Sequence, residues 1–507
     1  MPLNAAASAV ALDRVGIADA ADAIRAWLPR ARWFGGRERR VRGVELEDLG
    51  VIRSDAPTVL LTLWRVDYAG GGSEVYSLPL GVRPTPPPLA ELGPDHLIAT
   101  LTGRREGSLL VYDALADPEA ADELWRLLDA ETSVPTNAGR LEAHRLTPIE
   151  SPAGELPHLL GVQQTNSALV RGQRDFLKWN RLIEPGPSAE LEMVEALTSR
   201  GFPHLAALRG YLAYARAGQP PAAQAILQAY LPNGSEGWAM AQTSLRDLYD
   251  VAESTGAAST REHRELVDEQ GGSFEPEAVR LGEVTAELHL ALADPNLPPA
   301  LAPTRVTSEQ LAGWATSMTS ELDHLLQSAQ PAVAPLAAKR DLIAARFEAL
   351  RGLGGGGLAI RTHGDFHLGQ VLRTDDGWKI VDFGGEPRRS AQERRERSSP
   401  LRDVAGMLRS FDYAAAAALR ERTDPSDPLW PRLLAAGRSW AAANREAYWA
   451  AYLGRAAGSE LLPHPGATMV LRRAFELSKA VYEIGYELGH RPEWASIPLD
   501  FLLSGDR

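Results

Sequence analysis

The chain has 507 residues, of which 44% are hydrophobic and 23% are charged, as in folded proteins with more than one domain. A formal net charge of −13 argues against non-specific nucleic-acid binding. The absence of cysteine excludes disulfides, thiolate metal sites and a cysteine nucleophile. No stretch has the length and apolar character of a membrane span or a secretory leader, so we expect a cytoplasmic protein that does not bind membranes.

The first 135 residues predict a small α+β domain. Residues 20–34 carry a helical pattern that ends at Trp33 and Phe34. Apolar runs and alternation then predict strands, at 41–52, 58–69 and 73–82. Residues 109–131 change from a strand pattern to a helical one.

A second strand-rich segment spans residues 136–232. Its candidate strands are 144–150, 167–172, 174–180 and 225–232, and residues 187–201 form an amphipathic helix between them. Residues 233–507 are mainly helical, with 240–275 a loop or an irregular helical insertion. The expected fold is therefore α+β and bilobal, like a protein kinase, with residues 1–135 as an additional N-terminal domain.

The most informative stretch runs from Arg361 to Arg388. His363-Gly364-Asp365 precedes Gln370, and Asp382-Phe383-Gly384 follows a short apolar run. The turn residues at 375–377 predict a hairpin over 371–381, which returns both aspartates to one place. A phosphotransferase needs this order of parts: Asp365 accepts a proton from the acceptor hydroxyl, while Gln370 and Asp382 hold Mg²⁺ on ATP.

A kinase also needs a cation over the nucleotide phosphates, held by an acid. Lys178 lies in a strand pattern, and Glu190, Glu192 and Glu195 lie on the next helix. We expect Glu192 to pair with Lys178, with Glu195 as second choice. The alternative is a solvated lysine beside a charged helix face.

The nucleotide has two further candidate contacts. Residues 164–167, which include Asn166 and Ser167, occupy the turn where a phosphate loop is expected, although the turn is not glycine-rich. The connector from Gln228 to Leu231, which includes Tyr230, would offer backbone groups to the adenine. Other nucleotide and hydrolase motifs are missing: Walker A, HExxH and GxSxG.

His363 and His367 flank Asp365 but lack a nearby cluster of further metal ligands. A zinc site is therefore not expected. We expect His363 to pack against the catalytic loop and hydrogen-bond to it.

These motifs make the chain resemble the actinobacterial maltokinases, sugar kinases of the protein-kinase-like and aminoglycoside-phosphotransferase-like group. The segments that carry the resemblance are 27–36, 177–192, 230–238, 281–293, 363–372, 399–415 and 475–499. The resemblance implies an N-terminal cap domain (1–135), a small nucleotide lobe (136–232) and a helical lobe with the acceptor site (233–507). It also implies ATP-dependent conversion of maltose to maltose 1-phosphate for glycogen-type α-glucan synthesis, with a trehalose synthase-type pathway partner.

By the same resemblance, Arg402-Asp403 would stabilise the catalytic loop, and Lys479 and Tyr482 would line the sugar side. Two positions depart from the family pattern. Gly384 stands where DFEGEP has its first glutamate, and Ser478 stands where FELDKA has an aspartate. Both lie near the expected acceptor site, which leaves the sugar open.

A sister group of the maltokinases phosphorylates glucosamine to glucosamine 6-phosphate, which is the first alternative. Glu446, Tyr448 and Trp449 would suit an amino sugar, or else form an ordinary helix face with aromatics in the core. The full set of candidate acceptor contacts is His363, Arg402, Glu446, Trp449, Lys479 and Tyr482. The second alternative is a non-catalytic kinase-like binding protein.

Overall fold

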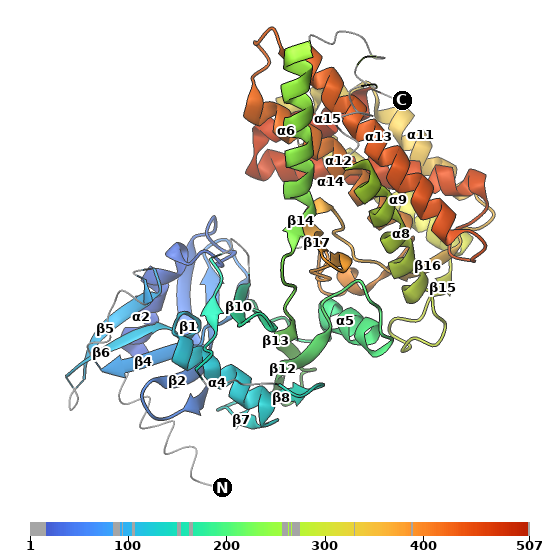
Figure 1. The fold of residues 1–507 in the computed structure, drawn as a ribbon. Coiled ribbons are helices and arrows are strands. Elements are labelled where there is room, and N and C mark those ends of the chain that lie inside the picture. Colours follow the sequence, from blue (N-terminus) through green and yellow to red (C-terminus); the bar gives the residue numbers. More distant parts are fainter. Residues whose placement is uncertain are drawn as a thin grey trace. The chain divides into compact units, whose positions relative to one another are not determined.

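The protein, seen in a computed structural model, divides into two compact units. The first comprises Met1–Glu192 and Ala206–Pro232, and the second comprises Met193–Leu205 and Asn233–Arg507. Figure 1 shows that strands dominate the first unit and helices the second, so the predicted α+β class is confirmed. The structure describes residues 17–84, 92–93, 95–103, 107–149, 154–161, 166–255, 262, 265, 274–328, 330–386 and 389–504.

The first unit begins with an antiparallel sheet whose described strands run in the order β1-β2-β4-β6-β5, with β3 also paired to β2. Helix α2 (Ile17–Trp27) and the short turn η1 (Leu28–Arg30) bury Ile24, Trp27 and Leu28 in a core with Trp64. The strands are β1 (Val41–Arg53), β2 (Thr58–Tyr68), β3 (Ser73–Ser77), β4 (Leu80–Pro84), β5 (Leu97–Gly103) and β6 (Gly107–Asp113).

Helix α4 (Pro118–Asp129) follows the turn η2 (Ala114–Ala116) and starts where the sequence provides a cap. The carboxylate of Asp117 accepts from the backbone N–H groups of Glu119 and Ala120, and Pro118 fits the first turn because its missing N–H has no helical partner there. The face with Leu124, Trp125 and Leu128 is buried.

A second antiparallel sheet has its described strands in the order β7-β8-β12-β13-β11-β10-β9. The expected strand at 144–150 is wrong in its bounds: β8 ends at Arg145, shortly before Pro148, which cannot donate to a ladder. The strand β12 was not predicted. The strands are β7 (Ser133–Pro135), β8 (Gly139–Arg145), β9 (His158–Leu159), β10 (Ser167–Arg171), β11 (Asp175–Trp179), β12 (Leu208–Arg216) and β13 (Ala222–Ala229).

The two sheets of the first unit share a hydrophobic core. Leu61 and Trp125 pack in one cluster with Leu169, Leu177 and other side chains of the second sheet. A buried ion pair adds to this contact, because Arg181 donates to Asp113 over 2.5 Å. The two strand-rich segments therefore pack against each other within one compact unit.

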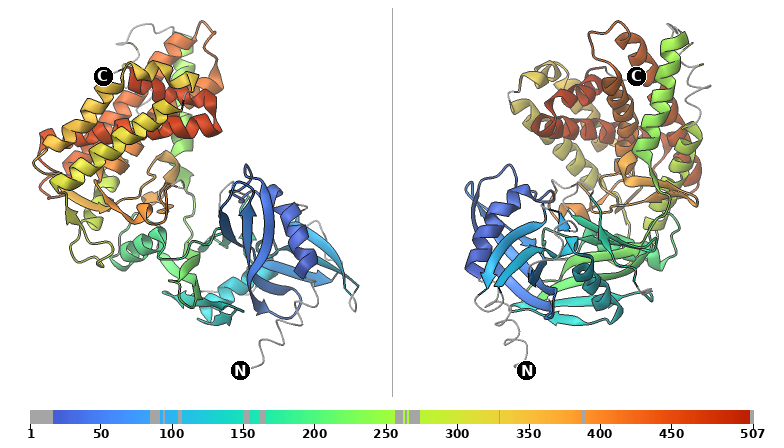
Figure 2. Two further views of the ribbon diagram at one scale, coloured as in Figure 1. Left: turned by 180° about the vertical axis from the view of Figure 1, so that it is seen from behind. Right: turned by 60° about the vertical axis from the view of Figure 1, so that its left-hand side comes forward.

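The second unit is built from long helices that pack against one another. Figure 2 shows the orange and red helices beyond residue 400 lying side by side, and α12 contacts α6, α13 and α14. The helices are α6 (Gly237–Thr255), α8 (Glu275–Leu292), α9 (Ser308–Gln327), α10 (Ala334–Ala337), α11 (Arg340–Glu348), α12 (Leu401–Arg422), α13 (Trp430–Ala456), α14 (Pro465–His490) and α15 (Ser496–Leu503). Helix α5 (Ala189–Ser199) begins in the first unit and ends in the second.

Residues 240–275 differ in part from the expected loop or irregular insertion. Helix α6 continues to Thr255, because Ala241, Leu245, Leu248 and Ala252 recur at helical spacing and are buried. Most of 256–273 lies outside the described residues.

Short strands of the second unit frame the HGD and DFG motifs. One sheet pairs β14 (Ser235–Glu236), β17 (Val371–Thr374) and β18 (Gly377–Ile380), and another pairs β15 (Thr304–Arg305), β16 (Leu358–Arg361) and β19 (Arg397–Ser398). The predicted hairpin over 371–381 is confirmed, with Val371 opposite Ile380 and Thr374 opposite Gly377.

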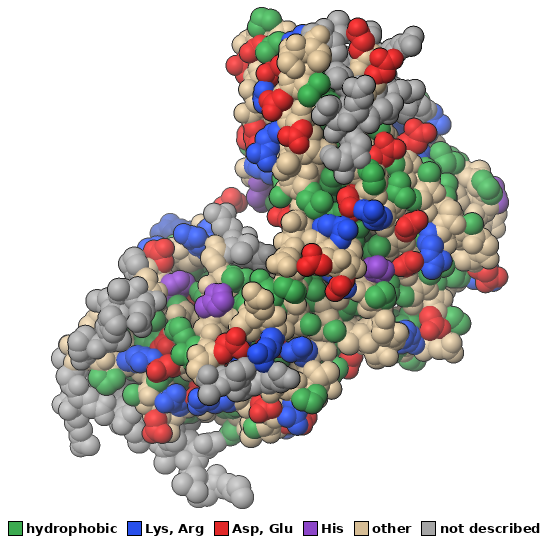
Figure 3. Space-filling view, in the orientation of Figure 1, with side chains coloured by type: hydrophobic (Ala, Val, Ile, Leu, Met, Phe, Trp, Pro, Cys, Tyr) green, Lys and Arg blue, Asp and Glu red, His purple; other side chains and the backbone are tan. Residues whose placement is uncertain are grey.

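Over the described residues, no helix combines the length and apolar character needed to cross a membrane. On the face seen in Figure 3, acidic and basic side chains are interspersed over both units.

Candidate active site

The candidate catalytic loop, which carries the HGD motif, follows β16 and is held by helix α12. The backbone N–H groups of His363 and Gly364 donate to the two carboxylate oxygens of Asp403, over 2.7 and 2.9 Å. Burial opposes ionisation of Asp403, but the hydrogen bond and charge of His289 (Nε2 to Oδ2, 3.3 Å) keep its pKa below the usual value. Asp403 thus has the loop-stabilising position that the resemblance implied.

A glycine lets α12 come this close. A Cβ on Gly406 would lie 2.5 Å from the carbonyl oxygen of Phe366, a distance that real side chains do not adopt. The close approach fixes the loop residue next to Asp365 against the helix.

Asp365 projects toward two polar side chains. Its Oδ1 lies 3.4 Å from Nζ of Lys479 on α14, and its Oδ2 lies 3.9 Å from Nε2 of His367. The ring of His367 accepts from the Gly369 N–H through Nδ1, so a neutral ring carries its proton on Nε2, facing Asp365. Desolvation lowers the pKa of His367 and favours this neutral form.

Lys479 also belongs to a buried ion network centred on Glu386. The carboxylate of Glu386 accepts from Lys479 (2.7 Å), Arg389 (2.7 Å) and Arg402 (3.0 Å). Burial would raise the pKa of Glu386, but the charges of Lys479, Arg402 and Arg389 lower it to about 2. Arg402, expected at the acceptor, instead binds this carboxylate.

The DFG segment is tied to the same loop. Nε2 of His363 lies 2.9 Å from the carbonyl oxygen of Val381, and the ring packs between Phe366 and Phe383. His363 is buried, which matches its expected packing role and corrects its assignment as an acceptor contact.

Gln370 and Asp382 lie at the same end of the hairpin, because the Val381 N–H donates to the Gln370 carbonyl over 3.0 Å. Asp382 has φ of +60°, a left-handed conformation that is uncommon for non-glycine residues and that clusters at functional sites. No group of three or more His, Cys, Asp or Glu side chains suited to a metal occurs within the described residues. An Asp and an amide are two oxygen ligands, which fits Mg²⁺ when phosphate and water supply the rest.

Lys178, the lysine expected to bind the nucleotide phosphates, lies in the first unit. Lys178 on β11 pairs with both carboxylate oxygens of Glu190, at 3.0 and 2.9 Å, and both side chains are buried. The predicted partner Glu192 is thus corrected to Glu190. Glu190 shares its helix face with the buried residues Met193, Val194 and Leu197, and this i, i+3, i+4, i+7 spacing was the signal that would have identified it.

Of the other residues expected to contact the nucleotide phosphates, Ser167 is engaged in an interaction within the protein. Ser167 is buried and its hydroxyl accepts from Arg181 over 2.8 Å, so it stabilises the core. Asn166 is half-buried at the adjoining turn, and positions 164 and 165 lie outside the described residues. These contacts correct Ser167 from a phosphate ligand to a structural residue.

Two polar groups of the connector also form hydrogen bonds within the protein. The Gln228 side chain donates to the Ala206 carbonyl over 2.9 Å, and the Tyr230 N–H donates to the Arg174 carbonyl over 2.7 Å. The Gln228 side-chain donor and the Tyr230 backbone donor are therefore already paired within the protein, and the adenine contacts expected of these residues would have to use other groups.

The predicted amino-sugar residues of α13 do not gather at a site. Tyr448 is fully buried, Trp449 stacks on Tyr452, and Glu446 is exposed. Arg472 lies 4.9 Å from the Trp449 ring. The core alternative for the aromatic side chains is correct, and Glu446 and Trp449 do not line the cavity described next.

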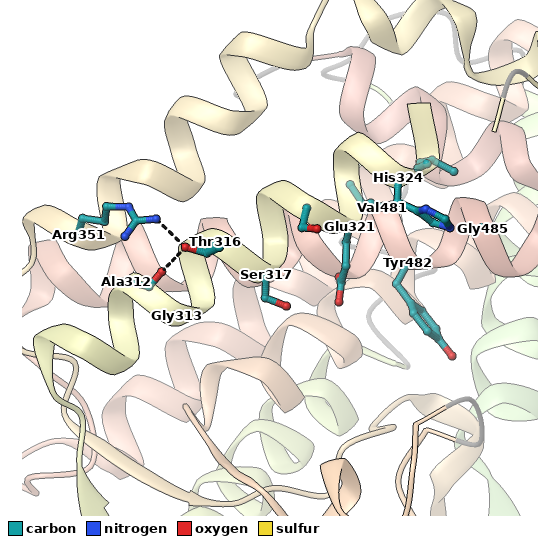
Figure 4. Close-up of a pocket in the computed structure, with 12 residues that line it drawn as sticks. Ala312, Gly313, Thr316, Ser317, Glu321, His324, Arg351, Val481, Tyr482 and Gly485 are labelled. Carbon is teal, nitrogen blue, oxygen red and sulfur yellow. Dashed lines mark hydrogen bonds between the residues drawn. The ribbon is translucent and has the colours of Figure 1, made fainter. Parts of the chain in front are cut away.

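A cavity of about 920 Å³ lies in the second unit between α9, α14 and the turn η5 (Ala349–Gly352). Tyr482 lines it, and Lys479 Nζ lies 4.9 Å from the Tyr482 ring centroid. Figure 4 shows Tyr482 among the lining residues, and through Tyr482 the cavity adjoins the Lys479 side chain that contacts Asp365. The α9 wall of this cavity was not predicted, because polar residues on one helix face resemble an ordinary solvated surface.

The chain is similar in sequence to known sugar kinases. The family model described as the maltokinase N-terminal cap domain matches residues 27–117. The chain is 30% identical over 429 residues to a glucosamine kinase of Streptacidiphilus jiangxiensis, covering 81% of this chain and 88% of the relative. It is 29% identical over 353 residues to a glucosamine kinase of Mycolicibacterium smegmatis, covering 68% and 78%.

Solved structures agree in fold. A glucosamine kinase in complex with glucosamine, ADP and inorganic phosphate aligns with a TM-score of 0.60 and 25% identity, over 92% of this chain and 95% of that one. A second crystal form of a glucosamine kinase aligns with a TM-score of 0.63 and 24% identity, over 94% and 97%. The chain therefore belongs to the maltokinase and glucosamine kinase group of sugar kinases.

Proposed function

We propose that this kinase transfers the γ-phosphoryl group of ATP to a hydroxyl of glucosamine, giving glucosamine 6-phosphate. The observation that carries the amino-sugar acceptor is the 30% identity to a glucosamine kinase over 88% of that relative. The site contributes the phosphotransfer groups, with Asp365 positioned by Lys479 and Lys178 anchored by Glu190.

In the proposed reaction, Asp365 accepts the proton of the acceptor hydroxyl as that oxygen bonds to the γ-phosphorus. The bond from phosphorus to the bridging oxygen breaks, and ADP leaves with the electron pair. Lys178 neutralises phosphate charge, and Lys479 holds Asp365 in place. Mg²⁺, held by Gln370 and Asp382, would neutralise the phosphates.

Residues 1–135, 136–232 and 233–507 are the proposed cap domain, nucleotide lobe and acceptor lobe. The cap match over residues 27–117 supports the first assignment. Hydrogen bonds from Ser77 and Ile183 across the two sheets hold the cap on the nucleotide lobe.

Maltose is the second candidate, because the matched cap domain is named for the maltokinases. In that case the product is maltose 1-phosphate and a trehalose synthase-type enzyme is the pathway partner. The catalytic roles of Asp365 and Lys178 are the same for both sugars.

One ADP-release assay tests the proposal by comparing kcat/KM for glucosamine, maltose and glucose under identical conditions. We expect the highest kcat/KM for glucosamine. In Asp365→Asn this kcat/KM should fall by about 10²- to 10⁴-fold, which is the contribution typical of a positioned general base. A higher value for maltose would replace glucosamine by the second candidate. Near-normal turnover in Asp365→Asn would refute the catalytic role.

A further inference from the structure

The α9 wall of the cavity carries polar side chains on one face. Ser317, Ser320, Glu321 and His324 line the cavity, and their i, i+3, i+4, i+7 spacing places them on one face of a helix. Figure 4 shows the Ser317 hydroxyl and the Glu321 carboxylate pointing to the same side as the Tyr482 phenol. The wall therefore offers hydroxyl groups and one carboxylate to a ligand.

Glu321 differs from the neighbouring acids in having no cation in contact. Glu386 has three cationic partners, whereas no hydrogen bond or ion pair to the Glu321 carboxylate occurs in the described part of the chain. The side chain is half-buried, and burial raises its pKa. A carboxylate in such a place is stabilised when a cationic ligand arrives.

The cavity lies beside the catalytic groups. Tyr482 and Lys479 are three residues apart on α14, and Lys479 reaches Asp365. Glu321 also lies close enough to Arg389, Glu386 and Arg402 to feel their charges. A ligand that fills this cavity is thus adjacent to the side chain that holds the base.

We propose that this cavity is the acceptor subsite and that the Glu321 carboxylate binds the 2-ammonium group of an amino sugar. This inference rests on the proposed glucosamine kinase function. Ser317 and Ser320 then contact sugar hydroxyls, and the Tyr482 ring packs against the sugar. Neither serine makes a side-chain hydrogen bond with another described residue, so both hydroxyls are available.

The test compares glucosamine with glucose, which has the same ring but a hydroxyl in place of the ammonium. Glu321→Gln keeps the shape and removes the charge. We expect its kcat/KM for glucosamine to fall about 10- to 100-fold, the effect of losing a charged hydrogen bond, while kcat/KM for glucose changes less than about threefold. Glu309→Gln, on an exposed position of the same helix, is the matched control and should match the wild type.

Binding provides a second readout. Calorimetry with glucosamine alone should show a weaker Kd in Glu321→Gln, and a thermal unfolding scan should show that the variant is folded. Equal losses on glucosamine and glucose, or no loss on either, would overturn the subsite while leaving the proposed function intact. A wild-type enzyme that does not phosphorylate glucosamine would overturn the proposed function and, with it, the ammonium partner.

Discussion

Asp403 provides the sharpest test of how the catalytic loop is held. Its two oxygens accept the N–H groups of His363 and Gly364, and Oδ2 also faces His289. In Asp403→Asn, one oxygen becomes an NH₂ group and can no longer accept. One of the two backbone N–H groups then loses its partner inside the protein.

The cost follows from the geometry. A hydrogen bond to a charged acceptor is worth about 1.5–3 kcal/mol, and a buried donor left unpaired costs about 1–3 kcal/mol. Since these are alternative descriptions of one loss, we expect local opening of the loop to become easier by about 2–3 kcal/mol. Each 1.4 kcal/mol is a factor of ten, so the His363 and Gly364 amides should exchange about 30- to 150-fold faster.

Hydrogen–deuterium exchange of a peptide covering residues 361–368 measures this change directly. In the same variant kcat should fall with every acceptor, because Asp365 follows the loop. Glu421→Gln, on the exposed end of the same helix, is the control and should leave both readouts unchanged. Wild-type exchange and kcat in Asp403→Asn would refute the reasoning.

Three further variants test other parts of the second unit. Gly406→Ala should lower the free energy of unfolding in urea by about 1–3 kcal/mol, because its Cβ would meet the Phe366 carbonyl oxygen at 2.5 Å. Gly454→Ala on α13, whose Cβ would meet nothing within 4 Å, should raise it by about 0.5–1 kcal/mol. A loss of stability in both variants would contradict the contact argument. In the folded protein the pKa of Glu386 is lowered to about 2 from its ordinary value of 4.5, so the ionised carboxylate stabilises the fold above pH 4.5 and this contribution is lost as the pH falls toward 2. The free energy of unfolding of the wild type should therefore fall more steeply between pH 4.5 and 2 than that of Glu386→Gln. Parallel pH dependences of the two proteins would contradict this role. Gly384→Glu should fold normally, since a Cβ there meets the Asp382 carboxylate at an ordinary 3.4 Å, and should raise maltose turnover relative to glucosamine; an unchanged ratio would show that position 384 does not select the acceptor.

Sequence reasoning succeeded where the functional residues are close in the chain. Asp365, Gln370 and Asp382 were placed on a loop and a short hairpin, and the hairpin register returns both ends to one place. Local turn chemistry decides such a structure, so the sequence alone predicts it.

It failed where tertiary packing chooses between equivalent residues. Glu190 and Glu192 are both in the first turn of α5, and only the burial of one helix face selects Glu190. Arg402 was expected at the sugar and instead binds Glu386, a residue from another loop. The α9 wall of the cavity was missed because no local signal separates a polar binding face from a solvated one.

The loop that carries Asp365 and the cavity between α9 and α14 are held by different residues. Variants of the two parts should therefore differ in their effect on activity. The catalytic loop depends on backbone hydrogen bonds to buried Asp403 and on the close contact at Gly406, so changes there should reduce transfer to every acceptor. The cavity is lined mainly by side chains on α9 and α14, and its lining includes neither Asp403 nor Gly406. Changes at Glu321 should therefore alter the choice between acceptors and leave the transfer chemistry intact. Measuring each variant on glucosamine, glucose and maltose separates the two classes, because a loop variant scales all three rates and a cavity variant changes their ratios.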